Sequence, residues 1–423
     1  MIRELTIFIA IFLAILTIAI PRKYFFVPYV LAACFVPTDQ RVIVMDLDFT
    51  VLRILVVAGV LRIFVRGEQR RIRWNKFDQM IFAWVTCGAV VYVLQWMDAK
   101  SVINRLGVLF DVIGMYWLFR QKIRSWDDVK FVLTILAFGA VALAPLVAFE
   151  RLTGRDPFII LGKVTTSVRS EWYRCQAAFP HAIMLGLFWA TLVPVFIGLA
   201  KTEPRKYLYW AATGASIFII CSTASTTPIG VLLQVLLLVA AFRYRSYGRP
   251  AIYCLVGLAV GLQLVMNHPV WHLVTYMNII GGSTGWHRYN LIDQAVRHLD
   301  QWALLGIRDT SSWGRGLGDV TNQYVLEGVR GGVVTLLLFM LLLIVAVKTV
   351  GRYSLRSMSV KQQWLAWCIC VSLLGHCLSF VGVSYFGQIM MLLYLNFAIV
   401  GFIYGVCGEA VAEEKSLGLI ASA

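Results

Sequence analysis

Residues 330–347 read Arg-Gly-Gly-Val-Val-Thr-Leu-Leu-Leu-Phe-Met-Leu-Leu-Leu-Ile-Val-Ala-Val, and a basic segment with Lys348, Arg352 and Arg356 follows. The hydrocarbon core of a bilayer is about 30 Å thick, and a helix of roughly 20 apolar residues crosses it. Short segments rich in Lys and Arg stay in the cytoplasm. This stretch therefore predicts a membrane-spanning helix whose C-terminal end is cytoplasmic.

Apolar segments of similar length recur along the chain, in which 60% of the 423 residues are hydrophobic. Soluble domains carry fewer apolar residues, so the sequence predicts an all-α, polytopic integral membrane protein with one transmembrane domain over residues 1–423. We expect about 12 transmembrane helices, within roughly 11–13, because prolines interrupt the first two segments. The expected spans are 5–20, 24–38, 43–65, 77–97, 102–119, 131–149, 181–200, 207–223, 226–242, 250–266, 330–347, 364–381 and 383–406.

Basic residues cluster between the expected helices, and these clusters set the orientation. Two helices separate each cluster from the next until the last interval, so all of them fall on the cytoplasmic face. The opposite, extra-cytoplasmic face holds two long polar segments, 150–180 and 267–330, while 408–423 forms a short, disordered cytoplasmic tail. The formal charge of +16 reflects this topology and contact with anionic lipids of the bilayer, and does not indicate nucleic-acid binding. The clusters are Arg66/Arg70/Arg71/Arg73/Lys76, Arg120/Lys122/Arg124/Lys130, Lys201/Arg205/Lys206, Arg243/Arg245/Arg249 and Lys348/Arg352/Arg356/Lys361.

The first outer segment, 150–180, carries five cations on the face where the positive-inside rule expects few. For Arg151 and Arg155, pairing with nearby carboxylates and binding of an anionic ligand remain equal alternatives. For Arg169 and Arg174 we favour a ligand, because they precede a helix that begins near Pro180 and helix N-termini attract anions. Arginine also grips phosphate oxygens with a rigid fork.

The large outer segment, 267–330, holds four of the six histidines and several arginines. Apolar residues at helical spacing predict an amphipathic helix over 288–302, followed by a glycine-rich turn and the return into the membrane at 319–324. Pro269 lies between His268 and His272 and disfavours a regular helix there, so we expect no metal site.

Two polar features lie within or beside the expected spans. The segment Ser222-Thr-Ala-Ser-Thr-Thr-Pro228 reads as a turn in which hydroxyl groups satisfy freed backbone groups. His376 lies inside a span, where it is either functional or a neutral side chain bonded to a neighbouring helix. Nearly all nine cysteines fall inside apolar spans and are expected to be buried thiols.

Four motifs in order resemble a known family. They are the segments 174–186 (beginning Arg174-Cys-Gln-Ala-Ala-Phe-Pro-His181), 222–230, 288–295 (Arg288-Tyr-Asn-Leu-Ile-Asp-Gln-Ala) and 319–332 (beginning Asp319-Val-Thr-Asn-Gln-Tyr-Val-Leu-Glu-Gly-Val-Arg330). The segment 116–128, at the cytoplasmic end of an expected span, is similar too. Together they resemble the superfamily of bacterial O-antigen ligases and O-antigen or exopolysaccharide polymerases. This resemblance implies a multi-pass protein of the bacterial cytoplasmic membrane that transfers glycan from an undecaprenyl-diphosphate donor outside that membrane, without metal, nucleotide or other cofactor.

The resemblance also implies roles for particular residues. Arg174 and Arg288 would hold the donor diphosphate with Arg169 beside them. In the ligases a histidine precedes the Asn of the last motif, whereas Thr321 stands here, so we expect a polymerase rather than a ligase. Candidate bases are Glu327, Asp319 and His287. The other expected substrate contacts are Asn322, Tyr324 and Arg330.

Three other readings stay open. A ligase would transfer the finished glycan to a lipid A-core or other acceptor. A transporter or flippase of lipid-linked sugars would place charges inside the spans, along a path. A structural protein would act with other polysaccharide assembly proteins, which are possible partners under every reading.

Overall fold

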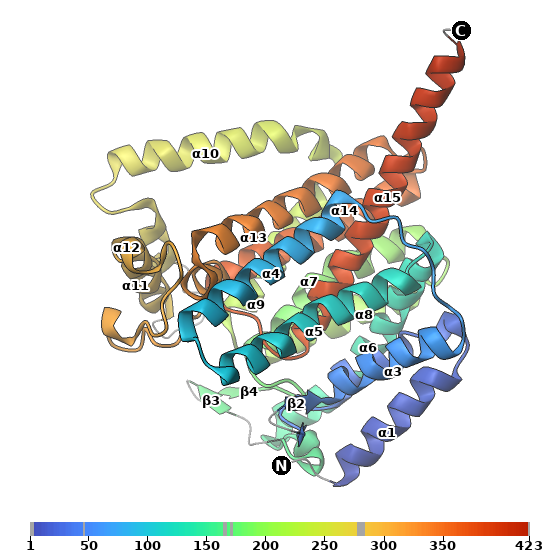
Figure 1. Ribbon diagram of the computed structural model, residues 1–423, viewed down its shortest axis with the longest axis horizontal. Helices are drawn as coiled ribbons and strands as arrows, with labels where there is room; N and C mark the ends of the chain where they lie inside the picture. Colours follow the sequence, from blue (N-terminus) through green and yellow to red (C-terminus); the bar gives the residue numbers. More distant parts are fainter. Residues whose placement is uncertain (1–3, 45–46, 164–166, 170–171, 277–283, 422–423) are drawn as a thin grey trace.

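The structure is a computed structural model that describes residues 4–44, 47–163, 167–169, 172–276 and 284–421. Within them, eight helical segments are long and apolar enough to cross a membrane (Figure 1). This confirms an all-α, multi-pass membrane protein. The segments are α4 Lys76–Trp96, α5 Ala99–Lys122, α6 Trp126–Thr153, α7 Ala182–Thr202, the pair α9 and α10 over Thr226–Val265, α13 Gln323–Arg356, α14 Val360–Gly382, and the Ile389–Cys407 part of α15 Ile389–Ala421.

The expected number of about 12 spanning helices is not confirmed, because several apolar segments form shorter helices. These are α1 Glu4–Ala19, α2 Val27–Phe35, α3 Val51–Val65 and α8 Lys206–Ser222. The expected span 43–65 is wrong in its first part, where β1 Arg41–Val44 and β2 Leu47–Thr50 form an antiparallel hairpin. Thr50 then caps α3, its side chain accepting a hydrogen bond from Arg53 N.

The remaining elements connect the helices. The 3-10 helix η3 Ala241–Tyr247 joins α9 Thr226–Ala240 to α10 Gly248–Val265. The tail expected to be disordered from residue 408 continues α15 as a helix, in keeping with its content of Ala, Glu, Lys and Leu. The other elements are η1 Arg22–Tyr24, η2 Pro157–Leu161, β3 Ser167–Arg169, β4 Trp172–Arg174, η4 Val270–Tyr276, α11 Thr284–Arg297, α12 Leu299–Trp302 and η5 Ser311–Trp313.

The basic segments meet at one end of the helical bundle, which we call the basic face. Lys130 pairs with Glu203 at 3.0 Å, and Arg245 donates a hydrogen bond to Gln363. The two long polar segments meet at the opposite end, the loop face, which carries β3, β4, α11 and α12 (Figure 1). Helix after helix therefore runs from one face to the other.

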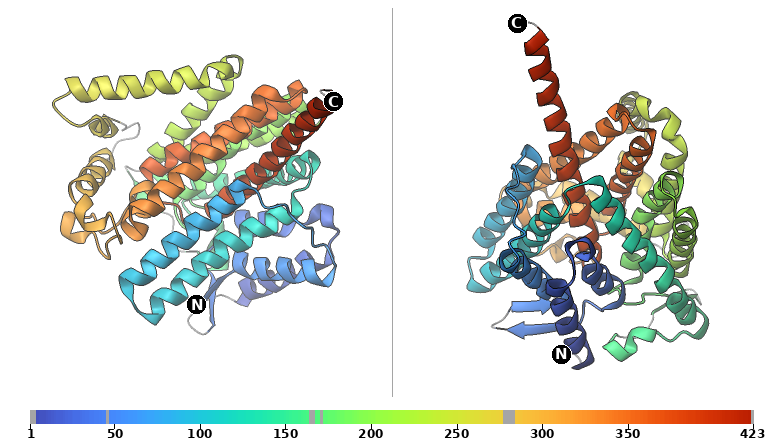
Figure 2. Two further views of the ribbon diagram at one scale, coloured as in Figure 1. Left: turned by 45° about the horizontal axis from the view of Figure 1, so that its top comes forward. Right: turned by 90° about the vertical axis from the view of Figure 1, so that its right-hand side faces the viewer.

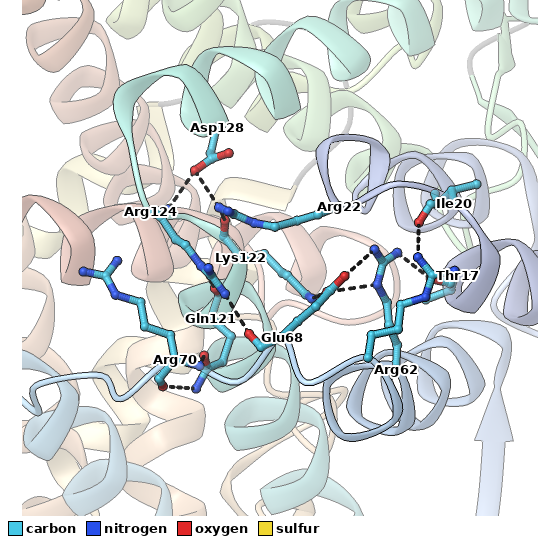
Figure 3. Close-up of polar contacts among 11 residues, drawn as sticks. Thr17, Ile20, Arg22, Arg62, Glu68, Arg70, Gln121, Lys122, Arg124 and Asp128 are labelled. Carbon is cyan, nitrogen blue, oxygen red and sulfur yellow. Dashed lines mark hydrogen bonds and ion pairs between the residues drawn. The ribbon is translucent and has the colours of Figure 1, made fainter.

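Glu68 organises the basic face between α3, α5 and α6 (Figure 3). Its carboxylate accepts hydrogen bonds from the Arg62 guanidinium at 2.9 and 3.1 Å and from the Lys122 ammonium. Arg124 donates to the Glu68 backbone carbonyl at 2.7 Å. Burial alone would raise the pKa of Glu68, but the hydrogen bonds from Arg62 and Lys122 lower it to about 2, so this carboxylate stays charged.

Helix α7 forms the centre of the bundle, and α10 lies outside it. Nearly every side chain of α7 is buried, and α7 packs against α8, α9 and α14. None of the described side chains of α10 is buried, and α10 stands apart from the other helices (Figure 2). A helix with exposed apolar side chains all round is typical of one that faces lipid.

Helix α13 is broken at Gly332, which has φ 71° and ψ 176°. In a continuous helix Val333 N would donate to Val329 O. Here Val333 N donates to Ala303 O at 2.8 Å, while Val329 O accepts from Ile307 N at 2.7 Å. The large polar segment thus takes up both backbone groups of the missing helical hydrogen bond and forms one hydrogen bond with each. These two hydrogen bonds hold the segment against α13.

We predict that Gly332→Ala destabilises the protein, because only glycine is at ease at this φ and a Cβ would collide with Leu304 O. A strained backbone position of this kind costs about 1–3 kcal/mol before the collision is counted. Thermal unfolding in detergent measures the loss. The matched control is Gly214→Ala in α8, whose added Cβ meets nothing within 4 Å and which should be neutral or slightly stabilising. An equal effect of both substitutions would contradict the role of the break.

Candidate functional site on the loop face

Two arginines from distant segments bind one short Ser/Thr turn between α8 and α9. Arg174, at the end of β4, donates from Nη2 to Ser225 Oγ at 2.9 Å. Arg288, on α11, donates from Nη2 to Thr227 Oγ1 at 2.8 Å and from Nε to Gly382 O at 3.2 Å. Because Ser225 and Thr227 are two residues apart, the structure brings together two of the arginines predicted from the sequence. We call this group the arginine–hydroxyl cluster.

Backbone contacts fix the segment that carries Arg174. Cys175 N donates to Ser222 O at 3.1 Å, which ties the segment to the end of α8. The carboxylate of Glu150, in the last turns of α6, accepts hydrogen bonds from Gln176 N and Ala177 N, both at 2.9 Å. A charged acceptor holding two backbone donors makes strong bonds in a buried place, so the first polar segment has a defined position.

An apolar cavity of ≈ 260 Å³ lies beside the arginine–hydroxyl cluster. Arg288 forms part of its wall, and the other walls are mostly aliphatic or small. An apolar cavity with a guanidinium in its wall matches a ligand that has an apolar part and an anionic part. The walls come from α9, η4, α11 and α14, including Thr227, Val231, Val274, Leu378 and Gly382.

His181 and Asp319 lie near Arg174. His181 caps α7, and its Nδ1 accepts a hydrogen bond from Ile183 N at 3.1 Å. Burial and the charges of Arg174 and Lys163 lower the pKa of His181 to about 4, although Asp319 acts in the opposite direction. His181 is therefore neutral near pH 7 and serves as a hydrogen-bonding group. Sequence reasoning missed its capping role, although it directly precedes an apolar run.

Asn322 and Tyr324 make structural bonds where α13 begins. Asn322 caps the helix by accepting from Val325 N, and it donates to Val381 O, both at 3.0 Å. The Tyr324 hydroxyl donates to Cys377 O at 3.0 Å. These bonds join α13 to α14 and account for both residues without a substrate.

Glu327 lies one turn further along α13, in a second cavity of ≈ 200 Å³. Its carboxylate accepts hydrogen bonds from Trp84 Nε1 at 2.9 Å and from Gln323 Nε2 at 2.7 Å. Arg105 of α5 and Arg330 of α13 line the same cavity. Sequence reasoning missed Arg105, although a charged residue inside an expected span is a signal in itself.

A third cavity of ≈ 160 Å³ shares Leu326 and Arg330 with this cavity. Arg330 lines both of them, and the third cavity also contains Arg308 and the exposed Asp319. The segment 319–330 thus contributes residues to both cavities, and Asp319 at its start also acts electrostatically on His181 beside Arg174. Three expected site residues, Asp319, Glu327 and Arg330, meet there.

The structure places the other candidate residues as follows, some of them in contacts within the protein that account for them. His287 is half-buried beside Arg288, while the side chain of Arg169 lies outside the described residues. Arg151 donates to Tyr173 O at 2.8 Å and lies over the Trp172 ring, so the contacts given for it are with a carbonyl and a ring and not with the expected carboxylates. His376 is hydrogen-bonded to Tyr385 at 2.8 Å and to Asn396 at 3.1 Å, as a neutral buried histidine should be.

The described part of the chain contains no group of three or more His, Cys, Asp or Glu side chains that could hold a metal ion. His268 and His272 stack on each other, with ring centroids 4.7 Å apart. A comparison of the sequence with protein-family models and with curated proteins finds no match.

We predict that Asp156→Asn changes how stability depends on pH. Burial, together with the charge of Glu150, raises the pKa of Asp156 to about 7, against an unfolded value of about 3.9. Between these values the folded chain binds more protons than the unfolded chain, so the contribution of Asp156 to stability falls as the pH rises through this window. Asparagine keeps the acceptor for Phe158 N and has no charge to bury.

Unfolding midpoints near pH 5 and pH 8 measure this effect. The loss of stability on raising the pH should be smaller in Asp156→Asn than in the wild type. Asp300→Asn, at an exposed carboxylate, should leave the loss unchanged. An identical pH profile for Asp156→Asn and the wild type would show that the Asp156 carboxyl does not titrate in this window.

Proposed function

We propose that this protein is a glycosyltransferase that polymerises oligosaccharide units linked to undecaprenyl diphosphate. The observation that carries the proposal is the arginine–hydroxyl cluster, in which Arg174 and Arg288 share one turn beside an apolar cavity. A polyprenyl diphosphate has the matching parts, an apolar chain and a double phosphate that two guanidinium groups can grip. The resemblance of the sequence motifs to polymerases and ligases supports the same reading.

The reaction needs leaving-group stabilisation and removal of one proton. An acceptor hydroxyl attacks the anomeric carbon of the donor sugar, a new glycosidic bond forms, and the bond to the diphosphate oxygen breaks. Undecaprenyl diphosphate leaves with its charge stabilised by Arg174 and Arg288. The hydroxyl proton passes to a carboxylate, for which Asp319 and Glu327 are the candidates, since both lie on the segment beside the cluster.

Thr321 supports a polymerase over a ligase. Its hydroxyl has no hydrogen-bond partner in the described part of the chain, and it offers no base at the position where ligases carry histidine. A positioned base contributes about 10²–10⁴-fold to such a step. A polymerase whose transition state is mostly dissociative depends less on this factor and more on stabilisation of the diphosphate by Arg174 and Arg288, so Thr321 is tolerable there.

The transporter alternative has less support. Arg53 in α3 and Asp111 in α5, charges that could line a path, bind each other through two hydrogen bonds at 2.6 and 2.7 Å. Arg174 and Arg288, from distant segments, converge at the loop face beside an apolar cavity. This distribution favours a reaction at one face over passage between the two.

The proposal requires the loop face to point out of the cytoplasm, in the bacterial cytoplasmic membrane, and labelling tests this. Ser312, in η5, is exposed on the loop face, and Met358 is fully exposed at the turn between α13 and α14 on the basic face. We predict that an impermeant maleimide added to intact cells modifies Ser312→Cys and not Met358→Cys, above the background of the wild-type cysteines. The reverse pattern would overturn the proposed reaction.

We predict that deletion of the gene removes long glycan chains while single units accumulate on the lipid carrier. Restoring the gene with Arg288→Lys should lower the polymerisation rate at least about tenfold, because lysine cannot bind Thr227, Gly382 and a phosphate with one planar fork. The matched control is Arg297→Lys, an exposed arginine on the same helix, paired with Asp293. It should keep full activity.

Three results would contradict parts of this proposal. Full-length polymer stranded on undecaprenyl diphosphate in the deletion strain would identify a ligase. Units trapped on the cytoplasmic side would identify a flippase. Normal chain length with Arg288→Ala, at normal protein level, would remove Arg288 from the reaction.

A further inference from the structure

The cavity that contains Glu327 holds more positive than negative charge. It lies between α4, α5, α13 and α15, and its three charged side chains are Arg105, Glu327 and Arg330. Arg330 and Glu327 both act electrostatically on Arg105. Two guanidinium groups and one carboxylate leave an excess of one positive charge in a place partly shielded from water.

These two arginines lack the ion pairs that other arginines in the helices have. Arg53 pairs with Asp111 at 2.6 Å, Arg62 with Glu68 at 2.9 Å, and Arg120 with Asp78 at 3.4 Å. Among the described residues, no carboxylate lies within 4 Å of Arg105 or Arg330. A charged group inside a membrane protein is costly unless it is paired or functional.

Arg105 is held in place and still has an open donor. Its guanidinium lies over the Tyr92 ring, 3.5 Å from the ring centroid, which orients it by a cation–π contact. Its Nε is buried and makes no hydrogen bond to any described residue. Glu327 does not supply the missing acceptor: its oxygens accept hydrogen bonds from Trp84 and Gln323, and it lies more than 4 Å from the Arg105 nitrogens.

The cavity can be reached from the loop face. Arg105 is in the second turn of α5 and Arg330 at the start of the third turn of α13, so both lie roughly 10 Å from the ends of their helices. Arg330 is exposed, and it also lines the third cavity, which contains Asp319. An anion on the loop face therefore meets Arg330 first and Arg105 behind it.

We propose that this cavity binds the carboxylate of an acidic sugar in the acceptor glycan. The assignment rests on the proposed function. It extends that function by stating that the polymer contains acidic sugars. Its volume is below the roughly 300–1,000 Å³ of sites for drug-sized ligands, so it fits one charged sugar and not a longer glycan. Trp84 and Tyr385 in its wall offer the aromatic surface against which a sugar ring packs.

The same oxyanion chemistry could come from a lipid headgroup, and the geometry favours the sugar. The third cavity shares Arg330 with this one, and its polar lining includes Arg308, Asp309 and Thr310 on the loop face. Such a lining suits a soluble glycan. Asp319 in the third cavity also acts electrostatically on His181 beside Arg174, so the proposed acceptor site neighbours the donor cluster.

Binding to the purified, full-length protein in phosphatidylcholine nanodiscs tests the inference directly. Glucuronate should bind and raise the unfolding midpoint, while glucose and the neutral glucuronamide should not. Arg105→Gln and Arg330→Gln should each weaken glucuronate binding about tenfold, the loss expected for one charge-assisted hydrogen bond. Arg297→Gln, outside the cavity, should bind like the wild type.

Glu327→Gln provides a variant with the opposite expected result. Glutamine keeps an acceptor and a similar shape but removes the competing negative charge, so glucuronate should bind at least about threefold more tightly. This substitution is expected to increase the affinity for glucuronate, whereas misfolding would lower it. Misfolding therefore cannot produce the expected result. Weaker binding by Glu327→Gln would overturn the charge argument.

Two further results would overturn the inference. One is no binding of glucuronate by the wild type. The other is stabilisation by phosphatidylglycerol nanodiscs that depends on Arg105 and that glucuronate does not compete with, which would assign the site to a lipid headgroup. Failure of the proposed function is seen separately: glucuronate binding would persist in a protein whose gene deletion leaves the glycan chains unchanged.

Discussion

The hydrogen bond that α13 gives up at Gly332 is the constraint on which the loop face depends. An unpaired backbone group inside a membrane protein costs several kcal/mol, so the freed Val333 N and Val329 O must find partners. They find Ala303 O and Ile307 N. The large polar segment is thereby held against α13, and the residues just before the break, Glu327 and Arg330, face the cavities that this docking encloses.

The two faces of the bundle use arginine in different ways. On the basic face, Arg62 and Lys122 bind Glu68, and Arg22 lies 3.3 Å from Asp128 (Figure 3). These are compensated charges that join α3, α5 and α6. On the loop face Arg174 and Arg288 bind hydroxyl groups of one turn, and Arg105 and Arg330 line a cavity. This contrast supports the proposal that an anionic ligand binds on the loop-face side of the bundle.

The segment 319–330 lines the proposed acceptor site and reaches the neighbourhood of the proposed donor site. Asp319, at its start, acts on His181 beside Arg174 and also lines the cavity of Arg330. Asn322 and Tyr324 anchor it to α14. A carboxylate on a segment fixed in this way is held where a hydroxyl from one site could meet an anomeric carbon from the other.

The sequence by itself determined the class of protein, and it predicted two faces and the arginines of the proposed site. Apolar run length and the positions of Lys and Arg are local properties, and local properties can be read along a chain. Arg174 and Arg288 stood out because they are cations where few are expected. The sequence could not fix the number of full spans. The residues packed around 43–65 in the fold decide whether this segment forms one helix or a hairpin followed by a helix.

Only the tertiary structure decided what these residues contact. Arg105 looked like one charge in an apolar run, and its partners Tyr92, Glu327 and Arg330 come from two other helices. The pair Gly331–Gly332 looked like the start of a span, but the break exists because the backbone at 303–307 supplies the missing bonds. Pairing of charges and of backbone groups across distant segments is a property of packing, and no periodicity in the sequence encodes it.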